Sequence, residues 1–78
     1  MFNLKEYIKD SSFKIHITNN NTYIDNYISI DTLNDNLIIL TFDTFKLRIE
    51  GNNFIIKKLV DQELLFSGYI NNINFELK

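Results

Sequence analysis

Few side chains in this sequence are of the types that carry out catalysis. The only histidine is His16, which we expect on the outward face of a β-strand because it alternates with apolar neighbours. A lone exposed histidine is far more commonly a solvated strand residue than a general base. The two glycines, at positions 51 and 68, do not form the G-x-S-x-G turn that presents a catalytic serine. With no cysteine in the chain, a thiolate nucleophile is excluded as well.

The acidic residues are placed for turns more than for acid–base chemistry. Aspartate is common in turns because its side chain bonds to nearby backbone groups. A glycosidase-like mechanism needs two carboxylates that face one another across a cleft, and these positions do not predict such a pair. We therefore predict that the protein is not an enzyme and has neither catalytic nor cofactor-binding residues. The aspartates in predicted turns are Asp25, Asp31, Asp35, Asp43 and Asp61.

A metal site is not expected either. Asp31, Asn34 and Asp35 bring oxygen ligands together, but they lack the spacing and the closing glutamate of a calcium loop. A turn stabilised by asparagine and aspartate side chains is the simpler interpretation. Zinc bound by thiolates is excluded because there is no cysteine. No glycine-rich loop precedes a predicted helix, so a phosphate cradle is not expected.

The charge balance argues against a nucleic-acid partner. The chain carries a net charge of −2, and its only local basic cluster is Lys57-Lys58. Affinity for phosphates comes from clustered lysine and arginine. Tyr23, Tyr27 and Tyr69 could stack on bases if they point outward, but packing in the core or at its rim is the simpler role for them.

Length and composition indicate one small globular domain. The chain has 78 residues, of which 45% are hydrophobic and 23% are charged. The N-terminal residues do not form the apolar run of a secretion signal, and no stretch approaches the ~18 apolar residues that span a bilayer. We therefore expect a cytoplasmic protein without direct membrane insertion.

The first ten residues are predicted to form a short helix. Leu4 and Ile8 are one turn apart and Phe2 lies beside them. A helix this short is marginal in water, so it must dock on something. Two interpretations stay open, a cap on the core of the domain and a docking helix for a partner or a membrane surface. For the second we name Phe2, Leu4 and Ile8 as the contact residues.

From residue 11 to residue 78 the pattern predicts a single all-β domain. The apolar period changes to two, as in Phe45, Leu47 and Ile49, and no long segment keeps a helical period. We expect Gly51 to open a tight hairpin turn at a positive φ. About seven short strands at spacings near ten residues favour a small antiparallel sandwich over a barrel. The predicted strands are 13–17, 22–24 with 27–30, 37–42, 45–50, 54–59, 63–68 and 69–77.

A domain of this size and composition should have exposed sheet edges. It buries only ~60% of its unfolded surface, so its stability is marginal. The chain has no proline to block pairing at an edge strand. Both properties favour self-association, giving a homo-oligomer, or a permanent protein partner.

The C-terminal half shows a more specific pattern. Residues 47–59 follow an L-x-I-x-G-x-x-L-x-I-x-x-L-like rhythm in which Phe54 takes an apolar position, and a second glycine and another alternating strand follow in residues 66–73. This pattern, centred on Gly51 and Gly68, resembles the YabP/YqfC family of sporulation proteins, and the likeness covers residues 13–77. The resemblance implies an immunoglobulin-like sandwich and a spore-forming bacterium. Because members act in the mother cell and their genes lie beside those of membrane proteins, it implies an adaptor for a membrane protein.

Three functions therefore stand as expectations. The first is a cytoplasmic, non-enzymatic adaptor or assembly factor in sporulation, held near a membrane through its partner. The second is a structural module that self-assembles through its sheet edges. The third is a β-sandwich that binds a small ligand, which would require a concave pocket.

Overall fold

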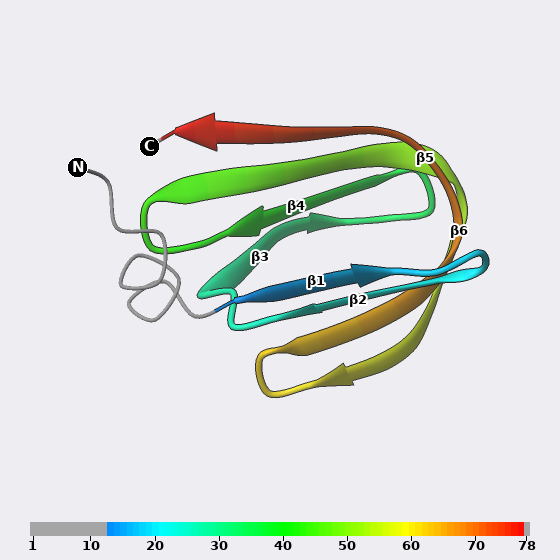
Figure 1. The fold of residues 1–78 in the computed structure, drawn as a ribbon, viewed down its shortest axis with the longest axis horizontal. Coiled ribbons are helices and arrows are strands. Elements are labelled where there is room, and N and C mark those ends of the chain that lie inside the picture. The colour runs from blue at the N-terminus through cyan, green and yellow to red at the C-terminus, as the bar shows by residue number, and fades with distance from the viewer. Residues whose placement is uncertain (1–12, 78) are drawn as a thin grey trace.

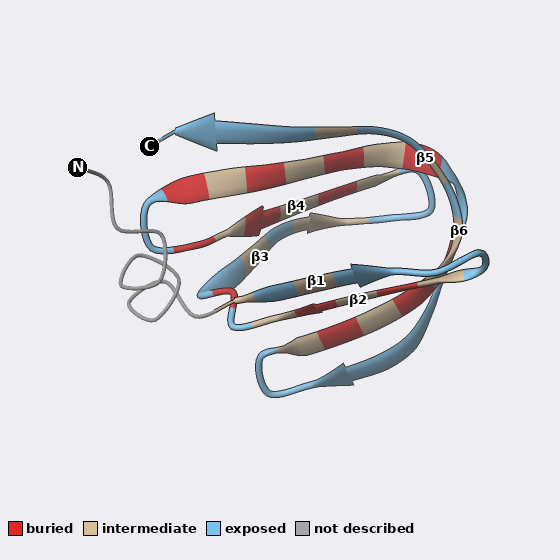
Figure 2. Cartoon of the chain, in the orientation of Figure 1, coloured by how far each residue is buried: buried red, intermediate tan, exposed pale blue. Residues whose placement is uncertain are grey.

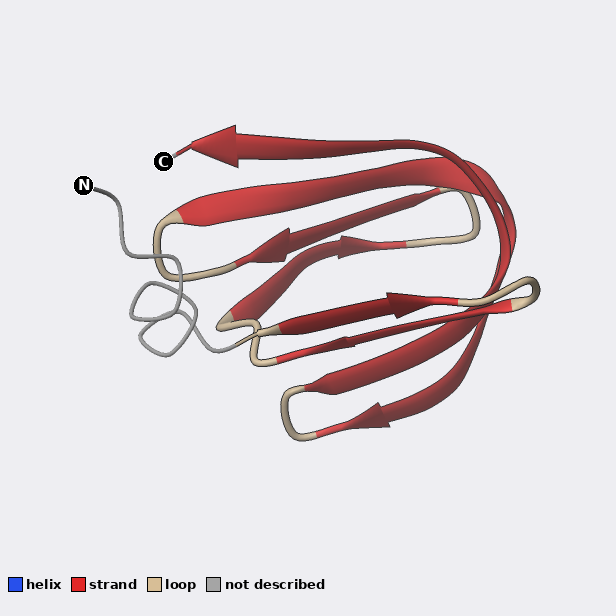
Figure 3. Ribbon diagram, in the orientation of Figure 1, coloured by secondary structure: helices blue, strands red, loops and turns tan. Residues whose placement is uncertain are grey.

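The computed structural model describes residues 13–77 as an all-β unit. The helix expected over residues 1–10, with Phe2, Leu4 and Ile8, lies outside the described residues. Short turns join consecutive strands, and Figure 3 shows that strands account for most of the described chain. The strands are β1 (Lys14–Ile17), β2 (Asn21–Asp25), β3 (Ser29–Leu33), β4 (Leu37–Thr41), β5 (Phe45–Val60) and β6 (Glu63–Leu77).

All six strands belong to one antiparallel sheet with the order β1-β2-β6-β5-β4-β3 (Figure 1). The prediction of an all-β fold is confirmed. The finer prediction, an immunoglobulin-like sandwich of about seven short strands, is not confirmed, because the described residues form six strands in a single sheet. The difference arises because two pairs of predicted short strands, 45–50 with 54–59 and 63–68 with 69–77, are each one long strand.

The two long strands bend together near their middles, as Figure 1 shows at the right of the molecule. Before the bend, residues 46–50 of β5 pair with β4, and residues 45–50 pair with residues 72–77 of β6. After the bend, residues 55–60 of β5 pair with residues 63–67 of β6, which also pair with β2. Register shifts at Glu50/Gly51 and Asn52/Ile55 mark β-bulges, which bend a strand and increase its twist.

The predicted hairpin turn at Gly51 is wrong, because the chain bends there without reversing. Gly51 is buried and lies so close to the carbonyl oxygen of Tyr69 that a Cβ atom would overlap it. Gly68, opposite in the bend, has φ +126°, whereas Gly51 has no positive φ. Asn53, which also lies in the bend, has a positive φ of 59°. The two glycines therefore allow close approach and an unusual backbone angle inside the bend.

The turn between β3 and β4 holds the bend in place. The Gly51 amide donates to the carbonyl oxygen of Asn36 at 3.0 Å, and the Phe54 amide donates to that of Asp35 at 2.9 Å. The turn itself is closed by Asn34, whose Oδ1 accepts from the backbone amides of Asn36 and Leu37. This turn was expected from its asparagine and aspartate residues, but its contact with the bend was not.

One hydrophobic core lies within the bent sheet, where buried residues alternate along the strands (Figure 2). In β4 Ile38 and Leu40 are fully buried and alternate with half-buried neighbours, so one face of this strand lies in the core. The alternation predicted for Phe45, Leu47 and Ile49 is confirmed. The core residues are Ile24, Tyr27, Ile38, Leu40, Phe42, Phe45, Leu47, Ile49, Phe54, Leu64 and Phe66.

Replacement of either bend glycine by alanine should destabilise the fold strongly. In Gly51→Ala the new methyl group would overlap a backbone oxygen, and in Gly68→Ala the residue would be strained at φ +126°. Strain and overpacking of this kind lower the free energy of unfolding by about 2–4 kcal/mol. Urea unfolding of each variant would measure the change. Asn52→Ala is the control because the Asn52 side chain is exposed at the same bend. We expect it to change the free energy of unfolding by less than about 0.5 kcal/mol. Wild-type stability in Gly51→Ala would contradict the required close approach.

Candidate functional site

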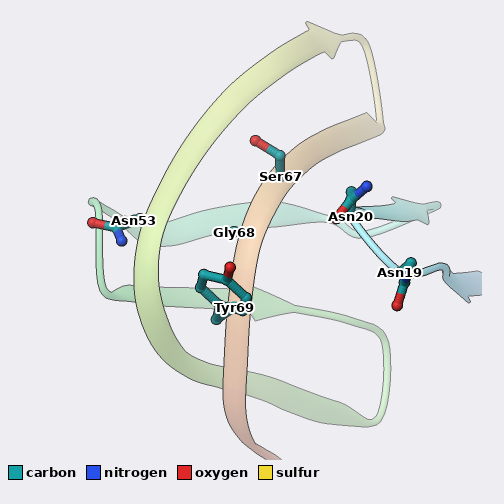
Figure 4. Close-up of a pocket in the computed structure, with 6 residues that line it drawn as sticks. All are labelled: Asn19, Asn20, Asn53, Ser67, Gly68 and Tyr69. Atoms are coloured by element: carbon teal, nitrogen blue, oxygen red, sulfur yellow. The ribbon is translucent and has the colours of Figure 1, made fainter.

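A shallow depression lies where the turn between β1 and β2 approaches the bend. Figure 4 shows Asn19 and Asn20 on the turn, with Asn53 on β5 and Ser67, Gly68 and Tyr69 on β6. Its volume is about 220 Å³, which is below the ~300–1,000 Å³ typical of small-molecule pockets. This depression is therefore too small and open for the enclosed pocket that a ligand-binding β-sandwich requires.

The chemistry of the depression is hydrogen bonding. Its three asparagine amides, a serine hydroxyl and a phenol offer both donors and acceptors, but the lining includes no carboxylate, imidazole or cation. A nucleophile would need an adjacent base, and none of these residues supplies one. Tyr69 is 71% exposed at its rim. The arrangement suits contact with a polar backbone or amide better than bond making.

The main titratable cluster lies on the outer face of β2, β6 and β5. The Tyr23 hydroxyl lies 3.0 Å from Glu63 Oε1 and 3.3 Å from Asp25 Oδ2, and it donates toward both carboxylates. Lys58 Nζ is 3.4 Å from the same Glu63 oxygen. Burial, followed by the hydrogen bond to Glu63, raises the pKa of Tyr23 to about 12. The same bond, followed by the bond from Lys58, lowers the pKa of Glu63. These are cross-strand pairs of the kind that align neighbouring strands.

Two of the three residues considered as oxygen ligands for a metal, Asp31 and Asn34, use their side chains within the fold. Asp31 lies in β3, where Thr41 Oγ1 donates to its Oδ2 at 2.8 Å and Lys46 Nζ lies 3.1 Å from the same oxygen. The bond from Thr41, followed by that from Lys46, lowers the pKa of Asp31. Asn34 closes its turn, as predicted. In residues 13–77 no three His, Cys, Asp or Glu side chains are grouped as a metal site would require.

The remaining candidate residues are scattered. His16 is exposed on β1, where it is paired with Tyr23 in the register of the sheet. Tyr27 is buried, and its hydroxyl has no hydrogen-bond partner, so its ring serves the core. Only Tyr69 of the three tyrosines considered for base stacking is largely exposed. Lys57, of the basic pair considered for nucleic-acid binding, donates to Asn21 Oδ1 at 2.8 Å.

Exposed apolar side chains gather instead along the final residues of β5. Beyond Phe54 every residue of the strand is exposed, and its second side has no neighbouring strand within the described chain. We call residues 55–60 the β5 edge. Exposed edges were predicted from the sequence, and the bend in the two long strands places one of them at residues 55–60. The exposed apolar residues of the β5 edge are Ile55, Ile56, Leu59 and Val60.

A model of the YabP family matches residues 9–78. The chain belongs to the YabP family. The match covers Gly51 and Gly68, and it confirms the resemblance inferred from the residues around them. No match to the chain was found among curated proteins or among solved structures. As for membrane association, the part of this YabP-family chain that the structure describes has no helix able to cross a bilayer.

The raised pKa of Tyr23 predicts that the folded chain loses stability at high pH. The unfolded chain releases a tyrosine proton near pH 10, whereas folded Tyr23 keeps it until about pH 12. Between these values the folded state binds more protons, so its stability falls as the pH rises. Urea unfolding at about pH 9 and about pH 11.5 should show a smaller fall for Tyr23→Phe than for the wild type. Tyr69→Phe is the control, and an equal fall in both variants would contradict the assignment.

Proposed function

We propose that this chain is a non-enzymatic adaptor or assembly factor that acts in spore formation on a membrane-protein partner. Membership of the YabP family is the observation that carries the proposal, because the family suggests a sporulation-associated protein. On this proposal the chain works in the cytoplasm of the mother cell and reaches the membrane through its partner. It needs neither a cofactor nor a nucleic acid.

The surface chemistry of residues 13–77 supports an interaction role. The described side chains make cross-strand hydrogen bonds, as between Tyr23 and Glu63 and between Thr41 and Asp31. The apolar residues of the β5 edge lie beside unpaired backbone groups. Such an edge can accept an extended peptide segment, with backbone hydrogen bonds giving affinity and side-chain contacts giving specificity.

The β5 edge indicates what kind of segment would fit. Two residues of the edge, Ile55 and Val60, lie on the outer face of the sheet, as do their partners Ser67 and Glu63. The other two apolar residues, Ile56 and Leu59, lie on the core face, as do their partners Phe66 and Leu64. An added strand would therefore meet apolar side chains on both faces. Lys57 and Lys58 favour acidic residues in that strand. We propose an extended segment of the membrane protein, apolar with acidic residues, as the occupant.

Self-assembly through sheet edges is the second candidate function. It is favoured by open edges within residues 13–77: besides the terminal strands β1 and β3, the β5 edge and the last residues of β6 lack a neighbouring strand on one side. Pairing of one edge with the other would be head-to-tail and would continue without an endpoint. Light scattering would then show particle size growing with concentration, whereas an adaptor keeps a defined size.

An affinity pull-down from growing and from sporulating cells would test the adaptor. We expect the tagged chain, after crosslinking, to recover one membrane protein during sporulation only. The double variant Ile55→Ser, Val60→Ser should lower that recovery about tenfold, because it removes apolar area from the outer face of the β5 edge. Recovery equal to the wild type would exclude this edge as the contact.

A matched control is available elsewhere on the surface. Ile28 is 59% exposed, close to the 63% of Ile55, but it belongs to the β2–β3 connection and not to the β5 edge. Ile28→Ser should leave recovery unchanged. Recovery of the chain alone in ladders of multimers would favour the self-assembling module, and recovery of the same proteins from growing cells would contradict a sporulation role.

A further inference from the structure

The last part of β6 is another open edge of the sheet within residues 13–77, besides the β5 edge and the terminal strands β1 and β3. We call residues 72–77 the β6 edge, which is drawn red near the top of Figure 1. These residues pair with residues 45–50 of β5 on one side. On the other side β2 reaches only residues 63–67, so no described strand pairs with the β6 edge there. One row of its backbone amides and carbonyls is therefore free of sheet partners among residues 13–77.

The β6 edge also carries uncovered side chains of the core face. Ile73, Phe75 and Leu77 are paired with Ile49, Leu47 and Phe45, and residues paired in this way project from the same face of a sheet. Those three β5 residues are buried, but Phe75 is 58% exposed and Leu77 is 89% exposed. The ring of Phe75 touches that of Phe45 at a centroid distance of 5.5 Å. Among residues 13–77 the apolar face therefore continues to the open edge without a cover.

The β5 edge and the β6 edge differ in how strongly they resist pairing with another strand. The β5 edge carries two lysines and a register shift between Ile56 and Lys58, and both features discourage edge-to-edge contact. The β6 edge is regular from Asn72 to Leu77, has no lysine in that range, and has Glu76 as its single charge. A regular apolar edge is a template for another strand.

The side chains of the β6 edge are symmetric about Phe75. Asn74 and Glu76 flank it on the outer face, and Ile73 and Leu77 flank it on the core face. We propose that the β6 edge pairs antiparallel with the β6 edge of a second copy, around a two-fold axis at Phe75. The two Phe75 side chains then face one another, and each Ile73 lies opposite Leu77 of the second copy. Because the same patch is used twice, the assembly closes as a dimer.

The charges fit this register. Glu76 lies opposite Asn74 of the second copy, whose amide can donate to the carboxylate, so the two glutamates do not oppose each other. Within its own chain Glu76 is paired with Lys46, and Asn74 is paired with Arg48. Position 74 therefore has a cationic neighbour inside the chain and an anionic neighbour in the dimer. A charge placed at position 74 must therefore change the stability of the monomer and the stability of the dimer in opposite directions.

The opposite effects of a charge at position 74 give the first test. On the full chain, sedimentation measures the Kd of the dimer and urea unfolding measures the stability of the monomer. A glutamate from Asn74→Glu should weaken the dimer, raising Kd roughly tenfold through two like-charge pairs, while it leaves the monomer as stable or more stable. A lysine from Asn74→Lys should do the reverse, giving a lower Kd and a less stable monomer. Asn36→Glu, in the exposed β3–β4 turn, is the matched control and should leave Kd unchanged.

The register can be tested by disulfide trapping, because the natural chain has no cysteine. Ile73→Cys and Leu77→Cys should each give little crosslinked dimer alone under mild oxidation. A mixture of the two should form it readily, since these positions face each other across the axis while Phe75 is retained. Ile55→Cys mixed with Leu77→Cys is the control, and it reports pairing between the two different edges.

The remaining outcomes would overturn the proposal. A monomer at every concentration, with no crosslink in the mixture, would leave the β6 edge to another occupant, such as residues 1–12 or a strand of a different protein. Crosslinking between positions 55 and 77, with size that grows without limit, would show head-to-tail assembly instead. The dimer does not depend on the adaptor role, because it uses the β6 edge and the proposed partner uses the β5 edge.

Discussion

The close approach of β5 and β6 at Gly51 and Gly68 is the constraint on which the rest of the structure depends. Gly51 lies against the Tyr69 carbonyl, and Gly68 has a backbone angle that other residues rarely adopt. Because both strands bend at this point, residues of β4 and the first half of β5 share one core with residues of β2 and the first half of β6. Without the bend the same sheet would be a ribbon with one apolar face exposed to water.

The bend also explains why the β5 and β6 edges are open in addition to the terminal strands β1 and β3. Each long strand changes its neighbours as it passes through the bend, so β5 loses β4 and β6 loses β2 on opposite sides. The strand ends beyond those neighbours keep apolar side chains that the core does not cover. The exposed apolar surface is thus a direct result of folding one sheet over one core, and it is the surface most suited to protein contacts.

The two edges have different chemistry and so suit different roles. Lysines and a bulge make the β5 edge selective, because a strand added there must satisfy Lys57 and Lys58. The β6 edge is regular and nearly uncharged, and its pattern about Phe75 is complementary to itself. A chain that uses one edge for a second copy and the other for a partner would present two partner sites on one dimer. Such an arrangement increases the apparent affinity for a partner held in a membrane.

The sequence by itself determined the all-β class, the core face of the first half of β5, the turns near residues 19–21 and 34–36 and the YabP family, because these depend on local alternation and on spacing along the chain. It could not decide what Gly51-Asn52-Asn53 does. The same three residues suit a reversal or a bulge, and the choice was made by contacts from Asn36, Asp35 and Gly68, which are distant in sequence. The open edges follow from that choice. Only the tertiary structure could therefore show that Phe75 and Leu77, which alternate like core residues, lie uncovered at an edge.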